Sequence, residues 1–283
     1  RTYARLRRPF RLIDHKMDVK NVLFISQEIA PYLPDTKMSR MGFDMPQGMQ
    51  EAGVQVRTFM PKYGLINERR NQLHEVIRLS GMNIIIDDTD HPLIIKVATL
   101  PSRAQVYFIY NDDYFAHNLT KELETTASPA ENDERSIFFV RGVIETVRKL
   151  RWQPQVIHCS GWITVLAMAY IRELYNDDPS FRDAKLIYSL WDDDFEQPLD
   201  SRMGEKLKLD GLSDDVLADV LNKPVDYLTL NKMALKYCDA VVQNSPNVNP
   251  ELLEMAKASG LPFLPYEEGK EFVMKNLEFY KSL

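Results

Sequence analysis

The sequence predicts an α/β protein built on one Rossmann-like, doubly wound and mostly parallel sheet. Three observations indicate this fold class. From residue 21 onward, short apolar runs typical of buried parallel strands alternate with amphipathic helical stretches. The first segments follow one another as strand, helix and strand, an order that implies a right-handed parallel unit. No internal repeat and no linker rich in Pro, Gly or Ser interrupts the 283 residues, so we expect a single domain over residues 17–283.

The individual elements follow from apolar spacing and from the polar turns between them. The expected strands cover residues 21–26, 54–60, 82–86, 93–99, 105–109, 156–159, 185–190 and 240–243. The expected helices cover residues 41–51, 131–148, 163–173, 225–236, 250–258 and 267–280. Segments 125–129 and 204–213 are rich in polar residues and contain proline or glycine, so we expect exposed loops there.

The composition is that of an ordinary globular protein, with 45% hydrophobic and 27% charged residues. The formal net charge is −6, which disfavours binding to nucleic acid, and no apolar stretch is long enough for a membrane span. The two cysteines, Cys159 and Cys238, fit neither a disulfide framework nor a metal-ligand spacing and are expected to be small buried hydrophobes. We therefore expect a cytoplasmic protein that uses no cofactor and no metal.

Residues 1–16 differ from the rest of the chain because they hold six basic residues and one acidic residue, and Met17 follows them. One interpretation is a targeting or membrane-surface segment. The other is a vector remnant or a start codon assigned too far upstream. We favour the second interpretation and expect this basic leader to lie outside the fold.

Ligands of a doubly wound sheet bind outside the carboxyl ends of its strands, so residues that directly follow strands are the first site candidates. These segments are 27–32, 111–113, 158–162 and 191–194. No GxGxxG or Walker sequence is present, which argues against a dinucleotide site and against a P-loop phosphate site. No GxSxG or HExxH sequence is present either, so the corresponding hydrolase and zinc-protease classes are excluded.

Five segments, in the same order, resemble motifs of the bacterial glycogen and plant starch synthases. They are Ser26-Gln-Glu28-Ile-Ala-Pro31, Pro61-Lys-Tyr-Gly64, Asn132-Asp-Glu-Arg135-Ser-Ile-Phe138-Phe139, Pro154-Gln-Val-Ile-His158-Cys-Ser-Gly-Trp162 and Tyr237-Cys-Asp239-Ala-Val-Val-Gln-Asn-Ser245-Pro246. The last is similar to the family's Tyr-Ala-Asp-x-Val-Thr-x-Val-Ser-Pro. The resemblance implies the N-terminal, acceptor-side half of a GT-B glycosyltransferase. The family reaction is glucosyl transfer from ADP-glucose to α-1,4-glucan.

Several family positions carry different residues in this chain. Where the family has a Lys-Thr-Gly-Gly-Leu loop, the sequence is Pro34-Asp-Thr-Lys37-Met, so Pro34 replaces the lysine that faces the sugar-nucleotide phosphates. Trp191 stands where the resemblance places an active-site histidine. The motifs end near residue 250, before the nucleotide-binding half of the family. We therefore expect no intact catalytic group and no transfer by this chain alone.

The candidate acceptor or cleft residues are Glu28, Lys37, Asp113, His158, Trp162 and Trp191. Glu28 is expected either to contact the acceptor or to cap or pair at the end of the sheet. Trp162 either stacks on a sugar or packs a helix against the sheet, and Trp191 offers a second aromatic platform. His158 is expected to be a satisfied core histidine.

Two charged groups near these candidates allow simpler interpretations. Arg135 is expected to form a structural ion pair with Asp112 or Asp113. The acidic run 192–194 fits either a cation or sugar-hydroxyl site or a solvated loop, and we favour the loop.

Three functions remain open. The chain is a glucosyltransferase that works with a separate nucleotide-binding subunit, a non-catalytic module that binds α-glucan or maltooligosaccharide, or a regulatory module that docks onto a protein partner. The methionine-rich segment 38–49 would give the third function an adaptable surface.

Overall fold

The computed structural model describes residues 16–116 and 131–283. Its strands are β1 (Asn21–Ser26), β2 (Gln55–Pro61), β3 (His74–Glu75), β4 (Asn83–Ile86), β5 (Thr89–Pro92), β6 (Ile94–Thr99), β7 (Gln105–Tyr110), β8 (Val156–Ser160), β9 (Lys185–Leu190), β10 (Ala240–Gln243) and β11 (Phe263–Leu264). Its helices are α1 (Lys37–Glu51), α2 (Asp112–Phe115), α4 (Asn132–Lys149), α5 (Val165–Leu174), α6 (Met203–Leu209), α7 (Tyr227–Tyr237), α8 (Pro250–Ala258) and α9 (Glu271–Lys281). Short 3-10 helices cover Ile77–Leu79 and Trp162–Thr164.

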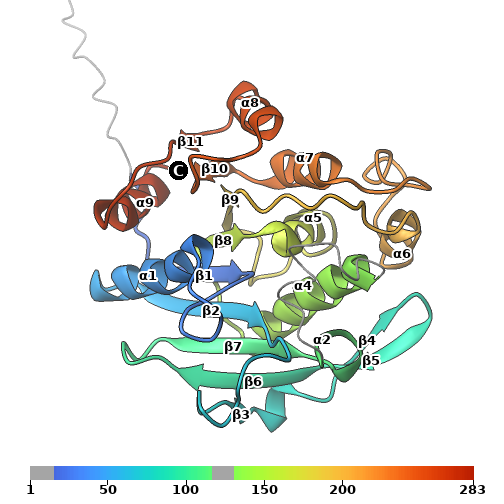
Figure 1. Cartoon of the computed structure of the whole chain (residues 1–283), viewed down its shortest axis with the longest axis horizontal. Coiled ribbons are helices and arrows are strands. Elements are labelled where there is room, and N and C mark those ends of the chain that lie inside the picture. The colour runs from blue at the N-terminus through green and yellow to red at the C-terminus, as the bar shows by residue number, and fades with distance from the viewer. Residues whose placement is uncertain (1–15, 117–130) are drawn as a thin grey trace, which may run out of the picture.

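Nine strands form one sheet in the order β11-β10-β9-β8-β1-β2-β7-β6-β3 (Figure 1). The strands from β11 to β7 are parallel, whereas β6 and β3 are antiparallel to their neighbours. Strands β4 and β5 pair separately as an antiparallel hairpin. The predicted α/β fold with a mostly parallel sheet is therefore confirmed.

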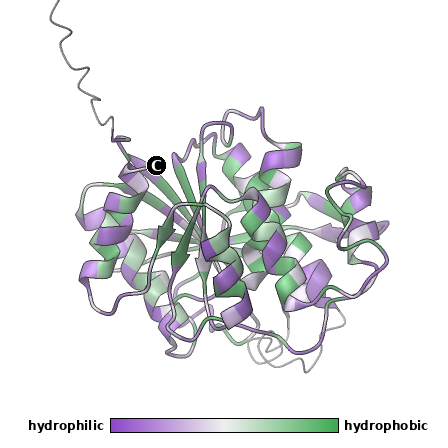
Figure 2. Cartoon of the chain, turned by 90° about the horizontal axis from the view of Figure 1, so that it is seen from above, coloured by the Kyte–Doolittle hydropathy of each residue, from purple (hydrophilic) through white to green (hydrophobic). Residues whose placement is uncertain are grey.

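Helices cover both faces of the sheet, as a doubly wound fold requires. Alternate residues of β1 contribute to two hydrophobic cores: Leu23 and Ile25 to one, Val22 and Phe24 to the other. The first core also contains residues of α4, α5 and α7, and the second contains residues of α1 and α9. Figure 1 shows α1 and α9 together on one side of the sheet, and Figure 2 shows the central strands mostly hydrophobic between helices with polar stretches.

Two expectations about local structure are wrong. Segment 204–213 is not an exposed loop, because it contains most of α6, and its Leu207 and Leu212 side chains are buried. Gly204 allows this packing, since a Cβ on it would lie 2.7 Å from the carbonyl oxygen of Val220. The methionine-rich segment is not an adaptable surface either, because three of its four methionines, Met38, Met45 and Met49, are buried. In this position, α6 also buries the Lys206 side chain against Asp133.

The basic leader and the expected loop at 125–129 lie outside the described residues, apart from Lys16. Lys16 lies 3.4 Å from Glu278, and the backbone N–H of Met17 donates to the carbonyl of Lys281 at 2.8 Å. The described chain therefore begins against the end of α9. Within the described ranges, no helix combines the length and the apolar character needed to cross a membrane.

Candidate functional site

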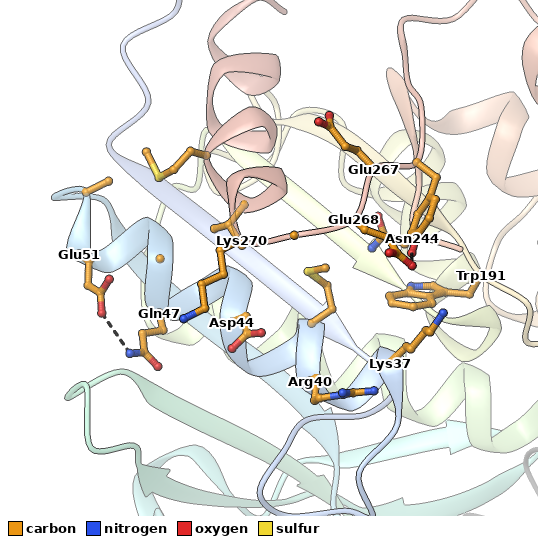
Figure 3. A pocket seen from close by; sticks show the side chains of 17 residues that line it. Lys37, Arg40, Asp44, Gln47, Glu51, Trp191, Asn244, Glu267, Glu268 and Lys270 are labelled. Atoms are coloured by element: carbon orange, nitrogen blue, oxygen red, sulfur yellow. Dashed lines mark hydrogen bonds between the residues drawn. The ribbon is translucent and has the colours of Figure 1, made fainter. Parts of the chain in front are cut away.

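A groove of about 880 Å³ runs between α1 and the segment that leads from β11 into α9 (Figure 3). Its volume lies within the range of about 300–1,000 Å³ typical of small-molecule sites. It is lined by Lys37, Arg40, Met41, Asp44, Gln47, Gly48, Glu51, Ala52, Trp191, Asn244, Tyr266, Glu267, Glu268, Gly269, Lys270, Val273 and Met274. These residues include two of the six predicted site residues, Lys37 and Trp191.

Three groove residues follow neighbouring strands of the sheet. Gln243 pairs with Leu190 at the ends of β10 and β9, and Asn244 and Trp191 come directly after this pair. Tyr266 follows β11, which pairs with β10, by two residues. The backbone N–H of Asn244 donates to the carbonyl of Leu190 at 2.9 Å, which extends the ladder past the end of β10. The groove therefore begins at the carboxyl edge of the sheet, where ligands of this fold class bind.

Helix α1 forms the opposite wall, and Thr36 fixes its first turn. The Thr36 Oγ1 accepts the backbone N–H of Ser39 at 3.0 Å, and the Ser39 hydroxyl accepts the N–H of Thr36 at 2.9 Å. This reciprocal cap starts the helix at Lys37 rather than at the predicted residue 41, and it places Lys37 and Arg40 on the groove wall.

Glu28 helps to fix the first turn of this helix. Its buried carboxylate accepts the Thr36 hydroxyl at 2.7 Å. A Cβ on Gly42 would lie 2.3 Å from the Glu28 carbonyl oxygen, so only glycine allows this close approach of α1. Glu28 is not among the groove residues, and its contacts correspond to the capping alternative.

Trp191 forms part of the groove but offers little of its ring to a ligand. It is 2% exposed, and its indole N–H donates to the Ser160 hydroxyl at 2.6 Å. The expectation of an open aromatic platform at this position is therefore corrected.

His158 and Trp162 lie in the core. The His158 ring contacts the hydroxyls of Ser189 and Tyr280, and burial lowers its pKa to about 3. Trp162 is 1% exposed and packs edge-on against Phe195, with ring centroids 5.2 Å apart. His158 is thus a satisfied core histidine, and the sugar-stacking alternative for Trp162 is replaced by packing.

The acidic run 192–194 has a structural role at its centre. The Asp193 carboxylate accepts the backbone N–H of Trp162 at 2.8 Å and the Tyr227 hydroxyl. Burial raises the pKa of Asp193 from 3.8 to about 6. Among the described residues, no group of three or more His, Cys, Asp or Glu side chains is placed to hold a metal ion.

This raised pKa predicts a pH dependence of stability. A carboxyl group with a higher pKa in the folded state stabilises the fold most below its unfolded pKa, and this stabilisation is lost as the pH rises through the folded pKa. Relative to Asp193→Asn, the wild type should therefore lose free energy of unfolding between about pH 4 and pH 7, measured by urea denaturation. Asp192→Asn, at an exposed neighbour, should follow the wild-type curve. Parallel curves for the wild type and Asp193→Asn would contradict this assignment.

Asp113 and Arg135 belong to a different cluster. The Asp113 carboxylate lies 3.0 Å from the His91 ring, and the other His91 nitrogen lies 2.9 Å from the Tyr114 hydroxyl. Arg135 forms an ion pair with Glu131 at 3.4 Å, and the expected pair with Asp112 or Asp113 is not present among the described residues. Asp113 is therefore not part of the groove.

The groove walls carry both signs of charge. Arg40 pairs with Asp35 at 3.1 Å, and Glu267 pairs with Lys275. In the part of the chain that the structure describes, Lys37 and Lys270 have no ion-pair partner. The groove thus offers positively charged donors and negatively charged acceptors of hydrogen bonds. Its described lining contains no histidine or cysteine.

Asn244 and Tyr266 are groove residues that the sequence analysis missed. Asn244 is 4% exposed, and its Oδ1 has no hydrogen-bond partner among the described residues. A buried polar atom left unpaired costs about 1–3 kcal/mol. Tyr266 keeps part of its ring exposed, and its hydroxyl donates to Glu268 at 3.1 Å. Both residues lie just after the end of a strand, and this position could have marked Asn244 as a site candidate. It could not have marked Tyr266, because β11 was not predicted.

The sequence comparison decides the family. A family model for the starch synthase catalytic domain matches residues 21–264. The chain belongs to this family. A glycogen synthase of Chlorobaculum parvum is 31% identical over 240 residues, which are 84% of this chain and 48% of that protein. A glycogen synthase of Chlorobium chlorochromatii is 37% identical over 171 residues, or 60% of this chain and 35% of that protein.

A solved structure agrees on the fold of the family. The catalytic domain of starch synthase IV from Arabidopsis thaliana, bound to ADP and acarbose, superimposes with a TM-score of 0.69 at 16% identity. The match covers 89% of this chain and 52% of that structure. The chain thus spans about half the length, or less, of the relatives that it matches.

Proposed function

We propose that this chain binds an α-glucan in the groove and does not transfer glucose by itself. The observation that carries the proposal is the groove itself, which opens at the carboxyl edge of the sheet in a member of the starch synthase family. The starch synthase IV structure, bound to ADP and acarbose, supports a carbohydrate ligand for this fold.

The lining suits a neutral sugar chain. Tyr266 presents a partly exposed aromatic ring, and an aromatic face packs well against the apolar face of a pyranose. Around it, amide, carboxylate and ammonium groups provide donors and acceptors for hydroxyls. Because the walls carry three basic and four acidic side chains, no single sign of charge dominates the groove.

Two residues argue against transfer by this chain. Pro34 stands at the family's lysine and has no side-chain cation to place near a phosphate. Trp191 stands at the family's histidine, and its only polar atom, the indole nitrogen, already donates to Ser160. A lost charge-stabilising donor costs about 10²–10³ in rate, so both changes together favour binding without turnover.

The binding half of the proposal is tested by calorimetric titration with maltoheptaose. The wild type should show saturable binding, and Tyr266→Ala should weaken it about tenfold, or about 1.4 kcal/mol. Tyr237→Ala is a matched control, because this tyrosine is also partly exposed and also donates to a glutamate, Glu173, at 2.8 Å, but does not line the groove. Its affinity should equal that of the wild type, and a wild type that ignores maltoheptaose at millimolar concentration would refute the proposal.

The transfer half is tested with ADP-glucose labelled in the glucose. We expect no incorporation of labelled glucose into glycogen above the background without protein. We also expect calorimetry to detect no binding of ADP-glucose with a dissociation constant in the micromolar range. Incorporation that disappears when a groove residue is replaced would restore the catalytic interpretation.

A further inference from the structure

We propose that a second cavity, at the opposite edge of the sheet from the groove, binds the phosphate group of a small molecule. The cavity has a volume of about 570 Å³, within the range of about 300–1,000 Å³ typical of small-molecule sites. It is lined by Glu145, Arg148, Lys149, Arg151, Gln153, Asp178, Pro179 and Ser180. None of these residues lines the groove, so this inference does not depend on glucan binding.

The cavity lies where the chain enters two neighbouring strands. One wall is the end of α4 with the loop before β8, and the other is the loop before β9. Strands β8 and β9 are parallel neighbours, so both loops lie at the amino edge of the sheet. The groove begins at the carboxyl edge, after the end of β9. The two sites are therefore separated by the length of the strands.

The first argument is the positive charge of this cavity. The Arg148 guanidinium donates to Asp178 at 2.8 Å and to both carboxylate oxygens of Glu145 at 3.1 Å, so both acidic residues of the lining are already paired. Lys149 and Arg151 have no ion-pair partner in the part of the chain that the structure describes. The lining thus holds three basic and two acidic side chains in a protein whose formal net charge is −6.

The second argument is an accessible hydroxyl on the facing wall. Ser180 is 6% exposed, and its backbone N–H donates to the Asp178 carboxylate at 2.9 Å, which fixes its position. Its hydroxyl makes no hydrogen bond with a described residue. In contrast to the Asn244 Oδ1, it is not one of the unpaired side-chain oxygens that are closed off from solvent. A ligand in the cavity can therefore reach the Ser180 hydroxyl.

The third argument concerns the chemistry of the ligand. An ionised phosphate group accepts hydrogen bonds on three oxygens, and lysine, arginine and hydroxyl groups are donors that suit it. The two acidic side chains of the lining and the negative net charge disfavour a polyanion such as nucleic acid. The cavity is larger than a phosphate ion requires, and the Gln153 amide offers a further donor and acceptor. These features favour the phosphate of a small sugar phosphate.

The test is calorimetric titration with fructose 6-phosphate at low ionic strength, where exposed charges are least screened. We expect saturable binding, which Arg151→Gly should weaken about tenfold. Arg151 has a φ of 52°, in the left-handed region that glycine adopts without strain, so this variant should keep or raise the thermal midpoint. A loss of affinity without a loss of stability separates ligand binding from a structural role of this arginine.

Arg103→Gly is the matched control. Arg103 is also exposed and also has a left-handed φ, of 69°, but it does not line the cavity. Its replacement removes the same charge and should leave the affinity for fructose 6-phosphate unchanged. Ser180→Ala, on the other wall, should weaken binding and keep the thermal midpoint. Equal weakening in the two arginine variants would show an effect of net charge and would contradict a site.

Inorganic phosphate and free fructose identify the group that is recognised. Inorganic phosphate should compete with fructose 6-phosphate, whereas fructose alone should not bind. Tighter binding of fructose 6-phosphate would assign the site to a sugar phosphate, and equal affinities would assign it to phosphate itself. If neither phosphate binds at millimolar concentration, or if Arg151→Gly binds as the wild type does, the proposal is wrong. Either result leaves glucan binding in the groove standing.

Discussion

Replacing Trp191 with alanine is expected to lower the free energy of unfolding by about 3–5 kcal/mol, the usual cost of deleting a buried aromatic side chain. The indole is almost completely enclosed at the end of β9, and its removal also leaves the Ser160 hydroxyl without its donor. Urea denaturation would measure the effect, followed by far-UV circular dichroism because the variant lacks one of the tryptophans.

Trp152→Ala provides the comparison for this variant. Trp152 is only partly buried and packs against the guanidinium of Arg57, so its loss should cost clearly less. If Trp191→Ala instead kept its stability and lost only glucan affinity, the indole would be the open sugar platform that the burial argues against.

Replacing Lys206 with alanine should also destabilise the protein by about 3–5 kcal/mol, because it leaves the buried Asp133 carboxylate without its cation. The Lys206 ammonium is 4% exposed and lies 2.9 Å from both Asp133 and Glu134. These two carboxylates raise the pKa of Lys206, although burial alone would lower it, so the lysine stays charged. Urea denaturation at neutral pH would measure the loss.

Lys208→Ala is the matched control on the same helix. Lys208 also pairs with an aspartate, Asp214, at 2.9 Å, but both side chains are exposed. Exposed pairs contribute about 0–1 kcal/mol, so this variant should stay close to the wild type. Equal losses in the two variants would show that α6 tolerates neither change and that the buried pairs are not the cause.

Much of the fold could be predicted from the sequence because parallel strands are buried on both faces and therefore form continuous apolar runs. The expected strands at 21–26, 185–190 and 240–243 match β1, β9 and β10 to the residue. Helix α6 could not be predicted, because it has only seven residues and its apolar signal is limited to Met203, Leu207 and Leu209. Strand β11 has two residues, too few to give any periodic signal.

The site was harder to predict than the fold. Trp191 directly follows a strand and lines the groove, and Lys37, which was singled out from the family motif, lines it as well. The sequence does not show how far a side chain is enclosed, however, and Trp162 and His158 are enclosed by partners at distant positions, Phe195 and Tyr280. The contribution of Tyr266 depends on the register of β11, which only the folded sheet defines.

The most direct test of glucan binding in the groove is a crystal structure of the chain grown with maltoheptaose. We expect glucose rings between α1 and the segment before α9, with one ring against Tyr266. An empty groove, or a glucan bound only at another surface, would contradict the proposed function.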